Sequence, residues 1–331
     1  MTKNIKSKMK SVILYASVAS LFIVSCGGPK QDGPKEENAH LTGEVKIDGS
    51  STVYPISEAV AEEFRTVQPK VRVTVGLSGT GGGFKKFSRG EIDINNASRS
   101  IKAGEIKSCE ENNIHSLELE IAYDGLSVVV NPQNTWVKDI TVAELKMMWE
   151  PSAQKKITKW NQIRKEWPNE EFRLYGAGTE SGTYDYFTEA INGKSHESRG
   201  DYTASEDDNV LVQGVSTDKN ALGFFGFAYY EENMDKLKLI PVDDLNDANG
   251  AGAILPSVET VKNKTYSPLS RPLFIYVNSE AVKRAEVTEF VKFYLENSKT
   301  LSREVGFIPL SDEEYAGQKK KFEDFLQTHS K

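Results

Sequence analysis

The chain has 331 residues, of which 38% are hydrophobic and 27% are charged, and its formal net charge is −7. This length is enough for two domains of ordinary size, and the composition is typical of a soluble globular protein. The acidic balance argues against a nucleic-acid-binding protein, because such proteins neutralise phosphates with Lys and Arg. It does not exclude a small anion, since local donors can hold an anion inside an acidic protein.

The first 25 residues have the pattern of a bacterial export signal. An apolar run, residues 11–24, is too short to cross a membrane as a helix of roughly 20 residues. It follows four basic residues: Lys3, Lys6, Lys8 and Lys10. Cys26 comes directly after Val24 and Ser25, in a sequence that resembles a lipobox, so we expect cleavage before Cys26 and acylation of its thiol. The alternative is an uncleaved signal anchor.

Cleavage at this point would make the remaining chain more acidic. Removing residues 1–25 takes away four Lys and no acidic residue, so the net charge falls from −7 to −11. Residues 26–43 are polar, rich in Gly and Pro and without periodicity, which predicts a flexible tether. Cys109 is the other cysteine, so no intramolecular disulfide is possible once Cys26 carries lipid. We interpret Cys109 as a structural or incidental thiol.

From Glu44 onward the sequence pattern predicts an α/β fold. We expect strands at residues 45–47, 71–77, 92–94, 126–130, 172–175 and 273–277. We expect helices at residues 55–64, 84–90, 141–149, 160–167, 184–191, 287–298 and 312–327. The run Leu126–Val130 is continuously apolar, which favours a buried parallel strand. Residues 221–229 are apolar and interrupted by Gly, which predicts a buried segment packed against backbone.

Two strand-like runs are candidates for the crossings between two domains. Ser127–Asn131 and Phe274–Asn278 both follow loops and end in an Asn. On this interpretation the chain leaves the first domain near residue 126 and returns to it near residue 272. The predicted domains are therefore residues 44–126 with 272–331, and residues 127–271.

Three of the strand-like runs end in short loops of Ser, Thr and Gly that open onto helix-like runs. The loops span residues 49–52, 78–83 and 178–183. Each offers hydroxyls and unpaired backbone N–H groups at a helix N-terminus, where the helix dipole favours negative charge. The alternative for any single loop is ordinary N-capping by Ser or Thr. Three such loops together predict a site for a small anion, assembled from distant segments.

The loops match no catalytic or nucleotide-binding motif. Gly76 and Gly81 have P-loop spacing, but two further glycines follow in place of Lys and Ser or Thr. No complete G-x-G-x-x-G or G-x-S-x-G is present. Metal-ligand spacing is missing, and residues 206–209 lack the acidic spacing of an EF-hand loop. The histidines lie in polar stretches, so none is an obvious base for a serine: His40, His115, His196 and His329.

Two charged residues suit an anion site. Arg99 follows the strand-like run at 92–94, and its planar guanidinium can hold two oxygens of an oxyanion at once. The alternative for Arg99 is an exposed surface arginine. Asp124 is either a turn former or the acceptor of the proton that hydrogen phosphate carries at neutral pH and sulfate lacks. An unpaired carboxylate would repel a fully ionised anion, so one such acceptor can reject sulfate.

Several long segments, in order along the chain, resemble the phosphate-binding proteins of the Pst-type ABC importer. They are GSSTVYPISEAVAEEF, TVGLSGTGGGFKKF, EIDINNASR, AYDGLSVVVN, YGAGTESGTYDYF and DYTASEDDNVLVQGV. The resemblance runs from Glu44 to the last helix. It implies a type II periplasmic-binding-protein fold, with two α/β lobes, a two-strand hinge and phosphate in the cleft. It also implies a monomer that has no cofactor or chemical step and delivers phosphate to a membrane permease driven by a separate ATPase.

The resemblance also implies a set of ligand residues. They are Ser51, Thr52, Ser78, Arg99, Ser181, Gly182 and Thr183. Family members that have an Asp at the position of Arg99 usually carry an Arg just before the third loop, where this chain has Gly176-Ala177-Gly178. The resemblance therefore suggests that the arginine has moved between lobes, which leaves Asp124 or Asp208 as the proton acceptor.

Other functions are compatible with the same loops. A receptor for another tetrahedral oxyanion, or a sensor subunit without transport, would use the same donors. A phosphohydrolase that uses a loop serine is the alternative from a different class. With the lipobox, the resemblance predicts an exported protein that is lipid-anchored to a membrane through Cys26, on the periplasmic or extracytoplasmic face, with inner or outer membrane left open.

Overall fold

The computed structural model describes residues 41–329 of the chain. The predicted export signal, Cys26 and the tether up to residue 40 lie outside the described residues. Within the described part, no helix combines the length and the apolar character needed to cross a membrane.

A mixed ten-stranded sheet organises the described chain, in the order β2-β1-β3-β11-β4-β8-β6-β7, with β9 and β12 each added to β4. A separate pair is formed by β5 and β10. The strand bounds are β1 Gly43–Gly49, β2 Val71–Val75, β3 Ile94–Ala97, β4 Ser116–Val130, β5 Ile140–Thr141, β6 Arg173–Ala177, β7 Thr203–Ser205, β8 Ala221–Gly226, β9 Lys238–Leu239, β10 Val242–Asp243, β11 Ser270–Asn278 and β12 Ile308–Pro309.

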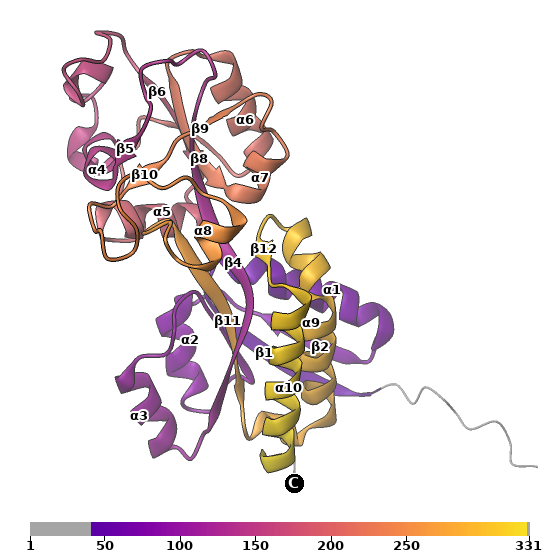
Figure 1. Cartoon of the computed structure of the whole chain (residues 1–331). Coiled ribbons are helices and arrows are strands. Elements are labelled where there is room, and N and C mark those ends of the chain that lie inside the picture. Colours follow the sequence, from indigo (N-terminus) through magenta and orange to yellow (C-terminus); the bar gives the residue numbers. More distant parts are fainter. Residues whose placement is uncertain (1–40, 330–331) are drawn as a thin grey trace, which may run out of the picture. The chain divides into compact units, whose positions relative to one another are not determined.

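The large sheet consists of two parallel sets joined by two antiparallel strands. We call β2-β1-β3 the first set and β8-β6-β7 the second set, and within each set the strands are parallel. β11 is antiparallel to β3, β4 is antiparallel to β8, and β4 and β11 pair antiparallel side by side (Figure 1). β4 changes partner along its length, pairing with β11 up to Gly125 and with β8 from Leu126 onward. These two strands therefore connect the two sets.

The expectation of a parallel strand at Leu126–Val130 is wrong, because this part of β4 is antiparallel to both β8 and β9. Its continuous apolarity has a different cause. Val128 and Val130 lie in one hydrophobic cluster, whereas Val129 faces another that contains Leu211 and Val215. Both faces of the strand are thus covered, which is the condition that removes the alternation of polar and apolar residues.

The helices cover both faces of the parallel sets. Their bounds are α1 Tyr54–Val67, α2 Gly79–Phe87, α3 Ala103–Glu111, α4 Val142–Trp149, α5 Gly182–Asn192, α6 Asp208–Thr217, α7 Phe227–Glu231, α8 Val258–Lys262, α9 Ala285–Glu304 and α10 Asp312–His329. Single 3₁₀ turns lie at Pro151–Ala153, Trp160–Gln162 and Ala281–Lys283.

Most of the expected helices are present, with shifted bounds. α1 has Pro55 in its first turn and buries Ile56, Val60 and Phe64, as its pattern predicts. The helix expected at 160–167 is reduced to one 3₁₀ turn. α3 and α6 were not predicted, because polar residues dominate the sequence of α3 and the acidic run before α6 is typical of a loop. The expected strand at 92–94 lies instead at 94–97.

Each parallel set has its own hydrophobic core. Around the first set, Phe64 contacts Phe290 edge-to-face, with a ring-centroid distance of 5.2 Å. Around the second set, Phe187 stacks on Phe224 at 3.7 Å and Trp149 meets both rings edge-on. Cys109 is buried and free, and burial raises the pKa of its thiol.

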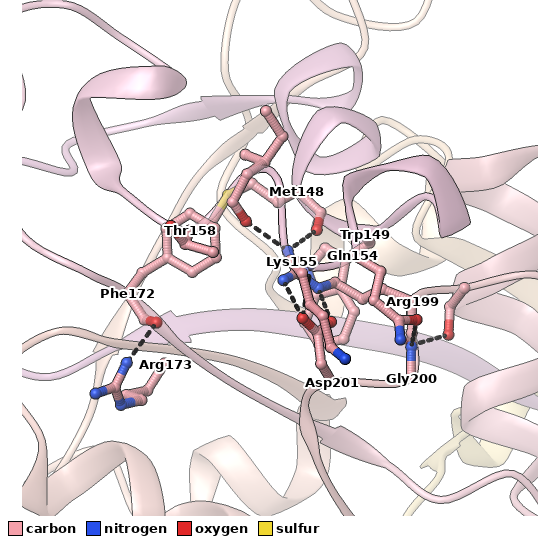
Figure 2. A network of polar contacts seen from close by, with 12 residues as sticks. Met148, Trp149, Gln154, Lys155, Thr158, Phe172, Arg173, Arg199, Gly200 and Asp201 are labelled. Carbon is pink, nitrogen blue, oxygen red and sulfur yellow. Dashed lines mark hydrogen bonds and ion pairs between the residues drawn. The ribbon is translucent and has the colours of Figure 1, made fainter.

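One buried arginine fixes the loop that follows α5 (Figure 2). The guanidinium of Arg199 donates to the carbonyl oxygens of Met148 and Ile157, at 3.0 and 2.8 Å. It also donates from Nε and Nη2 to the two carboxylate oxygens of Asp201, at 2.6 and 2.9 Å. The backbone N–H of Arg199 bonds the carbonyl of Trp149 at 3.0 Å. The loop at residues 193–202 is therefore tied to the end of α4.

We predict that Arg199→Ala lowers the free energy of unfolding by roughly 3 kcal/mol, because it leaves two carbonyls and the Asp201 carboxylate without their buried donor. Urea denaturation measures this loss. The matched control is Arg173→Ala, which removes an exposed arginine paired with Glu171 and should change stability by less than about 0.5 kcal/mol. Equal effects of the two substitutions would contradict the structural role of Arg199.

Candidate functional site

A cleft of about 430 Å³ lies at the ends of strands from both parallel sets. The residues that line it are Ser50, Ser51, Thr52, Gly79, Thr80, Gly81, Ser98, Arg99, Asp185, Tyr186, Glu189, Ser195 and Arg271. Four of the contributing segments follow the carboxyl ends of the parallel strands β1, β2, β3 and β6. Crevices at such strand ends are where α/β sheets bind ligands.

The first loop does not cap its helix. Val53 is the N-cap of α1 and makes no side-chain capping bond. Ser51 Oγ instead donates to Oδ2 of Asp185 at 2.6 Å, and Thr52 Oγ1 lies 3.4 Å from the carbonyl oxygen of Gly182. Simple N-capping is therefore the wrong interpretation for Ser51 and Thr52. Their hydroxyls reach α5, the helix that follows β6 of the second set.

The second predicted loop is mostly helical, since α2 begins at Gly79 and not at Phe84. Gly83 permits a close approach, because a Cβ there would lie 1.8 Å from Oδ1 of Asn95. Ser78 is the N-cap residue, but its backbone N–H and Oγ both donate to Oδ1 of Asp48, at 2.9 and 2.7 Å. Ser78 itself is not among the cleft-lining residues, whereas the adjoining Gly79 lines the cleft.

Asp48 anchors this second loop. Desolvation acts to raise the pKa of Asp48, but bonds from Lys86, Ser78 and the backbone N–H of Gly49 together lower it below its usual value. Asp48 is therefore an ionised carboxylate that holds the start of α2 against the end of β1.

The third loop lies directly against the first. Ser181 is the N-cap of α5, and its Oγ accepts from the backbone N–H of Thr183 at 3.1 Å. A Cβ on Gly182 would lie 2.6 Å from Cα of Thr52, so only Gly permits this approach. The first turn of α5 also brings Asp185 into the cleft wall. The N-terminus of α5, where Thr183 and Asp185 donate their N–H groups to Ser181, carries the positive end of the helix dipole.

Two arginines line the cleft, and each is held by a carboxylate that does not line it. Arg99 donates from Nη1 and Nη2 to the two oxygens of Glu105, at 2.9 and 2.8 Å. Arg271 donates from Nε to Oδ2 of Asp124 at 3.3 Å and from Nη2 to Oγ1 of Thr52 at 2.8 Å. Its guanidinium carbon stacks 3.5 Å from the ring centre of Tyr186.

Arg271 is one of the cleft residues that sequence reasoning missed; the others are Ser98, Asp185, Tyr186, Glu189 and Ser195. The side chain of Arg271 is only 13% exposed, and the register of β11 places it directly opposite Asp124 on β4. One signal could have found it. Arg271 is a lone cation at the start of the apolar strand run at 273–277, next to the position where the chain was expected to return between domains.

The two candidate proton acceptors lie away from the cleft lining. Asp124 is 2% exposed, and burial raises its pKa while Arg271 opposes that shift. Burial, with the charges of Asp207 and Glu206, raises the pKa of Asp208 in the first turn of α6 to about 7. Of the residues that line the cleft, the carboxylates are Asp185 and Glu189.

The contacts do not assemble a serine nucleophile. His196 Nε2 lies 2.9 Å from Oδ1 of Asp185, and Ser51 bonds the other carboxylate oxygen. A nucleophilic serine needs a base at its own hydroxyl, with the carboxylate behind that base. Here the carboxylate stands between serine and histidine. Among the described residues, no group of three or more His, Cys, Asp or Glu is placed to hold a metal ion.

Comparison with known proteins identifies the family. Residues 34–298 match the family described as the PBP superfamily domain. The chain is 53% identical over 289 residues to protein SphX of Synechococcus elongatus, covering 87% of this chain and 84% of that one. It is 37% identical over 316 residues to the phosphate-binding protein PstS of Staphylococcus saprophyticus, covering 95% and 93%.

A solved structure is also similar. It is described as a possible phosphate-binding protein from Planctomyces limnophilus and matches with a TM-score of 0.82 and 47% identity, covering 86% of this chain and 99% of that one. The chain therefore belongs to the Pst-type phosphate-binding proteins of the PBP superfamily. The expected fold of two α/β lobes joined by a two-strand hinge is confirmed.

We predict that Gly182→Ala separates the first loop from the start of α5, because the new methyl group would overlap backbone atoms of Thr52. Hydrogen exchange should become faster at the amides of residues 182–185. The control is Gly317→Ala in α10, where a Cβ meets nothing within 4 Å. That substitution should leave these amides unchanged and raise the free energy of unfolding by about 0.5–1 kcal/mol. Unchanged exchange in Gly182→Ala would show that the two loops do not depend on this contact.

Proposed function

We propose that this protein captures inorganic phosphate in its cleft and delivers it to an ABC importer, without a chemical step. The observation that carries the proposal is the cleft at the strand ends, where two guanidinium groups and several hydroxyls converge next to a helix N-terminus. All of these are donors suited to a tetrahedral oxyanion. The names of the relatives, phosphate-binding proteins among them, support the same ligand.

The proposed ligand set extends the one expected from the sequence. Ser51, Thr52 and Arg99 line the cleft, and Arg271 joins them. Ser181, Gly182 and Thr183 at the N-terminus of α5 lie beside Thr52 and outside the residues that line the cleft. In this proposal they contribute through the backbone N–H of Gly182 and the positive end of the helix dipole, since the N–H groups of Ser181 and Thr183 already have partners. In this proposal Ser78 keeps α2 in place through Asp48, and Asp124 is the counter-ion that orients Arg271.

The two cleft arginines are each paired with a carboxylate. This pairing reduces the repulsion between the two positive charges and keeps each side chain in one orientation. Glu105 and Asp124 each hold one guanidinium in a fixed orientation. A guanidinium has five N–H groups, so donors remain for a ligand. Because the fork is already oriented, less side-chain entropy is lost when an anion binds.

Delivery to a permease requires two lobes that open and close. We propose residues 44–126 with 272–331 as one lobe and 127–271 as the other, with phosphate between them. The change of partner of β4 at Gly125 and Leu126 supports the first boundary. The register of β11, which starts with Ser270 opposite Gly125, supports the second, because it lies at the same level of the sheet.

The proposed location is outside the cytoplasm, at the periplasmic or extracytoplasmic face of a membrane. The basic and apolar N-terminus, followed by Cys26, supports export and lipid anchoring, with residues 26–43 as the tether. We propose that the anchored protein acts as a monomer, with the membrane permease as its partner.

Titration calorimetry on purified protein, freed of bound phosphate by unfolding and refolding, tests the function. We expect micromolar or tighter binding of phosphate and no heat with sulfate. A chromogenic phosphate ester should not be turned over. Absence of phosphate binding would overturn the proposal, and turnover that disappears in Ser51→Ala would favour the phosphohydrolase.

We predict that Arg271→Ala and Arg99→Ala each weaken phosphate binding at least tenfold, the scale of about 1.5–3 kcal/mol for a hydrogen bond to a charged group. The same calorimetry measures this. Arg173→Ala, an exposed arginine away from the cleft, is the control and should bind normally. Circular dichroism checks that Arg271→Ala folds although Asp124 loses its partner. If it does not fold, Arg271→Lys is measured in its place, because a lysine keeps a positive charge near Asp124. Normal affinity in a folded Arg271 variant would remove Arg271 from the site.

A further inference from the structure

The ring of Tyr186 packs against the guanidinium of Arg271 in the wall of the cleft. The guanidinium carbon lies 3.5 Å from the ring centre, which is van der Waals contact over the aromatic face. The other cleft arginine, Arg99, lies 5.6 Å from the ring centre of Phe84, so its ring contact is looser. Tyr186 is buried and Arg271 is largely buried, and cation–π attraction is strongest where little water reaches the pair.

The hydrogen bonds of Arg271 act in a different direction from this ring contact. Its Nε donates to Asp124 at 3.3 Å, and its Nη2 donates to Thr52 at 2.8 Å. All five N–H groups of a guanidinium lie in its plane, so these bonds fix the group within that plane. Glu105 holds Arg99 with two short bonds, whereas Asp124 contributes one longer bond. The aromatic ring is therefore the contact that resists tilting of Arg271 out of its plane.

The hydroxyl of Tyr186 is already used. It donates to the carbonyl oxygen of Pro268, just before β11, at 2.6 Å. A phenol has one hydrogen to donate, so this hydroxyl is not available to donate to a ligand. Burial raises the pKa of Tyr186, so the side chain stays neutral. Tyr186 thus offers the cleft a fixed aromatic face and no charge.

We infer that Tyr186 is a positioning residue for anion binding, whose ring holds the guanidinium of Arg271 in one orientation without supplying a negative charge. The inference rests on the proposed phosphate binding. A second carboxylate would also hold the arginine, but its charge would repel the anion. An aromatic face attracts the cation through its quadrupole and leaves the in-plane N–H groups free. Asp124 and Thr52 use two of the five, so donors remain for an oxyanion.

The helix that carries Tyr186 also contacts the hydroxyl partner of Arg271. Tyr186 and Gly182 lie about one turn apart on one face of α5. Gly182 lies so close to Thr52 that a Cβ would be 2.6 Å from the Cα of Thr52. Thr52 in turn accepts the bond from Nη2 of Arg271. α5 therefore holds Arg271 at its face and, through Thr52, at its edge, which reduces the entropy lost when an anion binds.

Substitutions of Tyr186 separate the effect of the ring from that of the hydroxyl. Tyr186→Leu removes the aromatic face, and calorimetry should show phosphate binding weakened by about three- to tenfold, the scale of ordering one long side chain. Tyr186→Phe keeps the face and loses only the bond to Pro268, so it should bind nearly as tightly as the wild type. Equal losses in the two variants would overturn the inference, because the hydroxyl would then carry the effect.

A double-mutant cycle with Arg271→Ala separates positioning of the arginine from a general effect on the cleft. In the Arg271→Ala background, Tyr186→Leu should change phosphate affinity by less than about twofold, because the ring has no guanidinium left to orient. A residue that acts only on the shape of the cleft would weaken binding by the same factor in both backgrounds, and that result would contradict positioning.

Fluorinated phenylalanines at position 186 keep the shape of the ring while they weaken the negative charge of its face. Phosphate affinity should fall steadily as the number of fluorines rises. Affinity that stays constant up to pentafluorophenylalanine would overturn the inference. Because the ring is retained, this series is also the measurement to use if Tyr186→Leu does not fold.

Phe187→Leu is the matched control, because it removes an aromatic ring from the neighbouring position of α5. Phe187 stacks on Phe224 in the core and does not line the cleft, so this variant should bind phosphate as the wild type does. If Phe187→Leu weakened binding as much as Tyr186→Leu, the cause would be the stability of α5 and the inference would fail. Wild-type protein that binds no phosphate would instead refute the proposed function, so the two failures are distinguishable.

Discussion

The arrangement of the cleft depends on one buried ion pair, formed by Arg271 and Asp124. Arg271 and Asp124 are opposite each other on β11 and β4, the strands that connect the two parallel sets. Because both side chains are largely buried, each needs the other as a charge partner. The guanidinium then reaches Thr52 and stacks on Tyr186. One side chain on the connecting strands thus contacts the first loop and α5 together.

Other charged side chains around the cleft are also held in place by a partner. Glu105 orients Arg99, Asp48 holds the start of α2, and Arg199 ties down the loop that carries His196. In each case a buried or half-buried charge is satisfied outside the cleft, so the groups that face the cavity are held in place before a ligand arrives. Such preorganisation reduces the entropy cost of binding. It also explains how an acidic protein can offer a local anion site.

The sequence predicted the α/β class, the loops and most helices, because these follow from local periodicity and turn chemistry. It failed where a residue's role depends on distant neighbours. The glycines of residues 79–83 predict a loop, yet this run forms the start of α2, and at Gly83 the close approach of Asn95 and Gly49 leaves no room for a side chain. The continuous apolar run Leu126–Val130 predicts a parallel strand, but the strand is antiparallel. The alternation of polar and apolar residues is lost because both faces of the strand are buried, and this burial does not depend on strand direction.

What the sequence by itself determined is the set of groups available to the site: the hydroxyls and glycines of three loops, Arg99, and an N-terminus typical of export. Only the tertiary structure decided which of them meet. Ser51 and Asp185 are 134 residues apart and form one hydrogen bond, and Arg271 reaches Thr52 across 219. Local patterns carry no record of such pairs, because strand register and the close approach at Gly182 set these contacts.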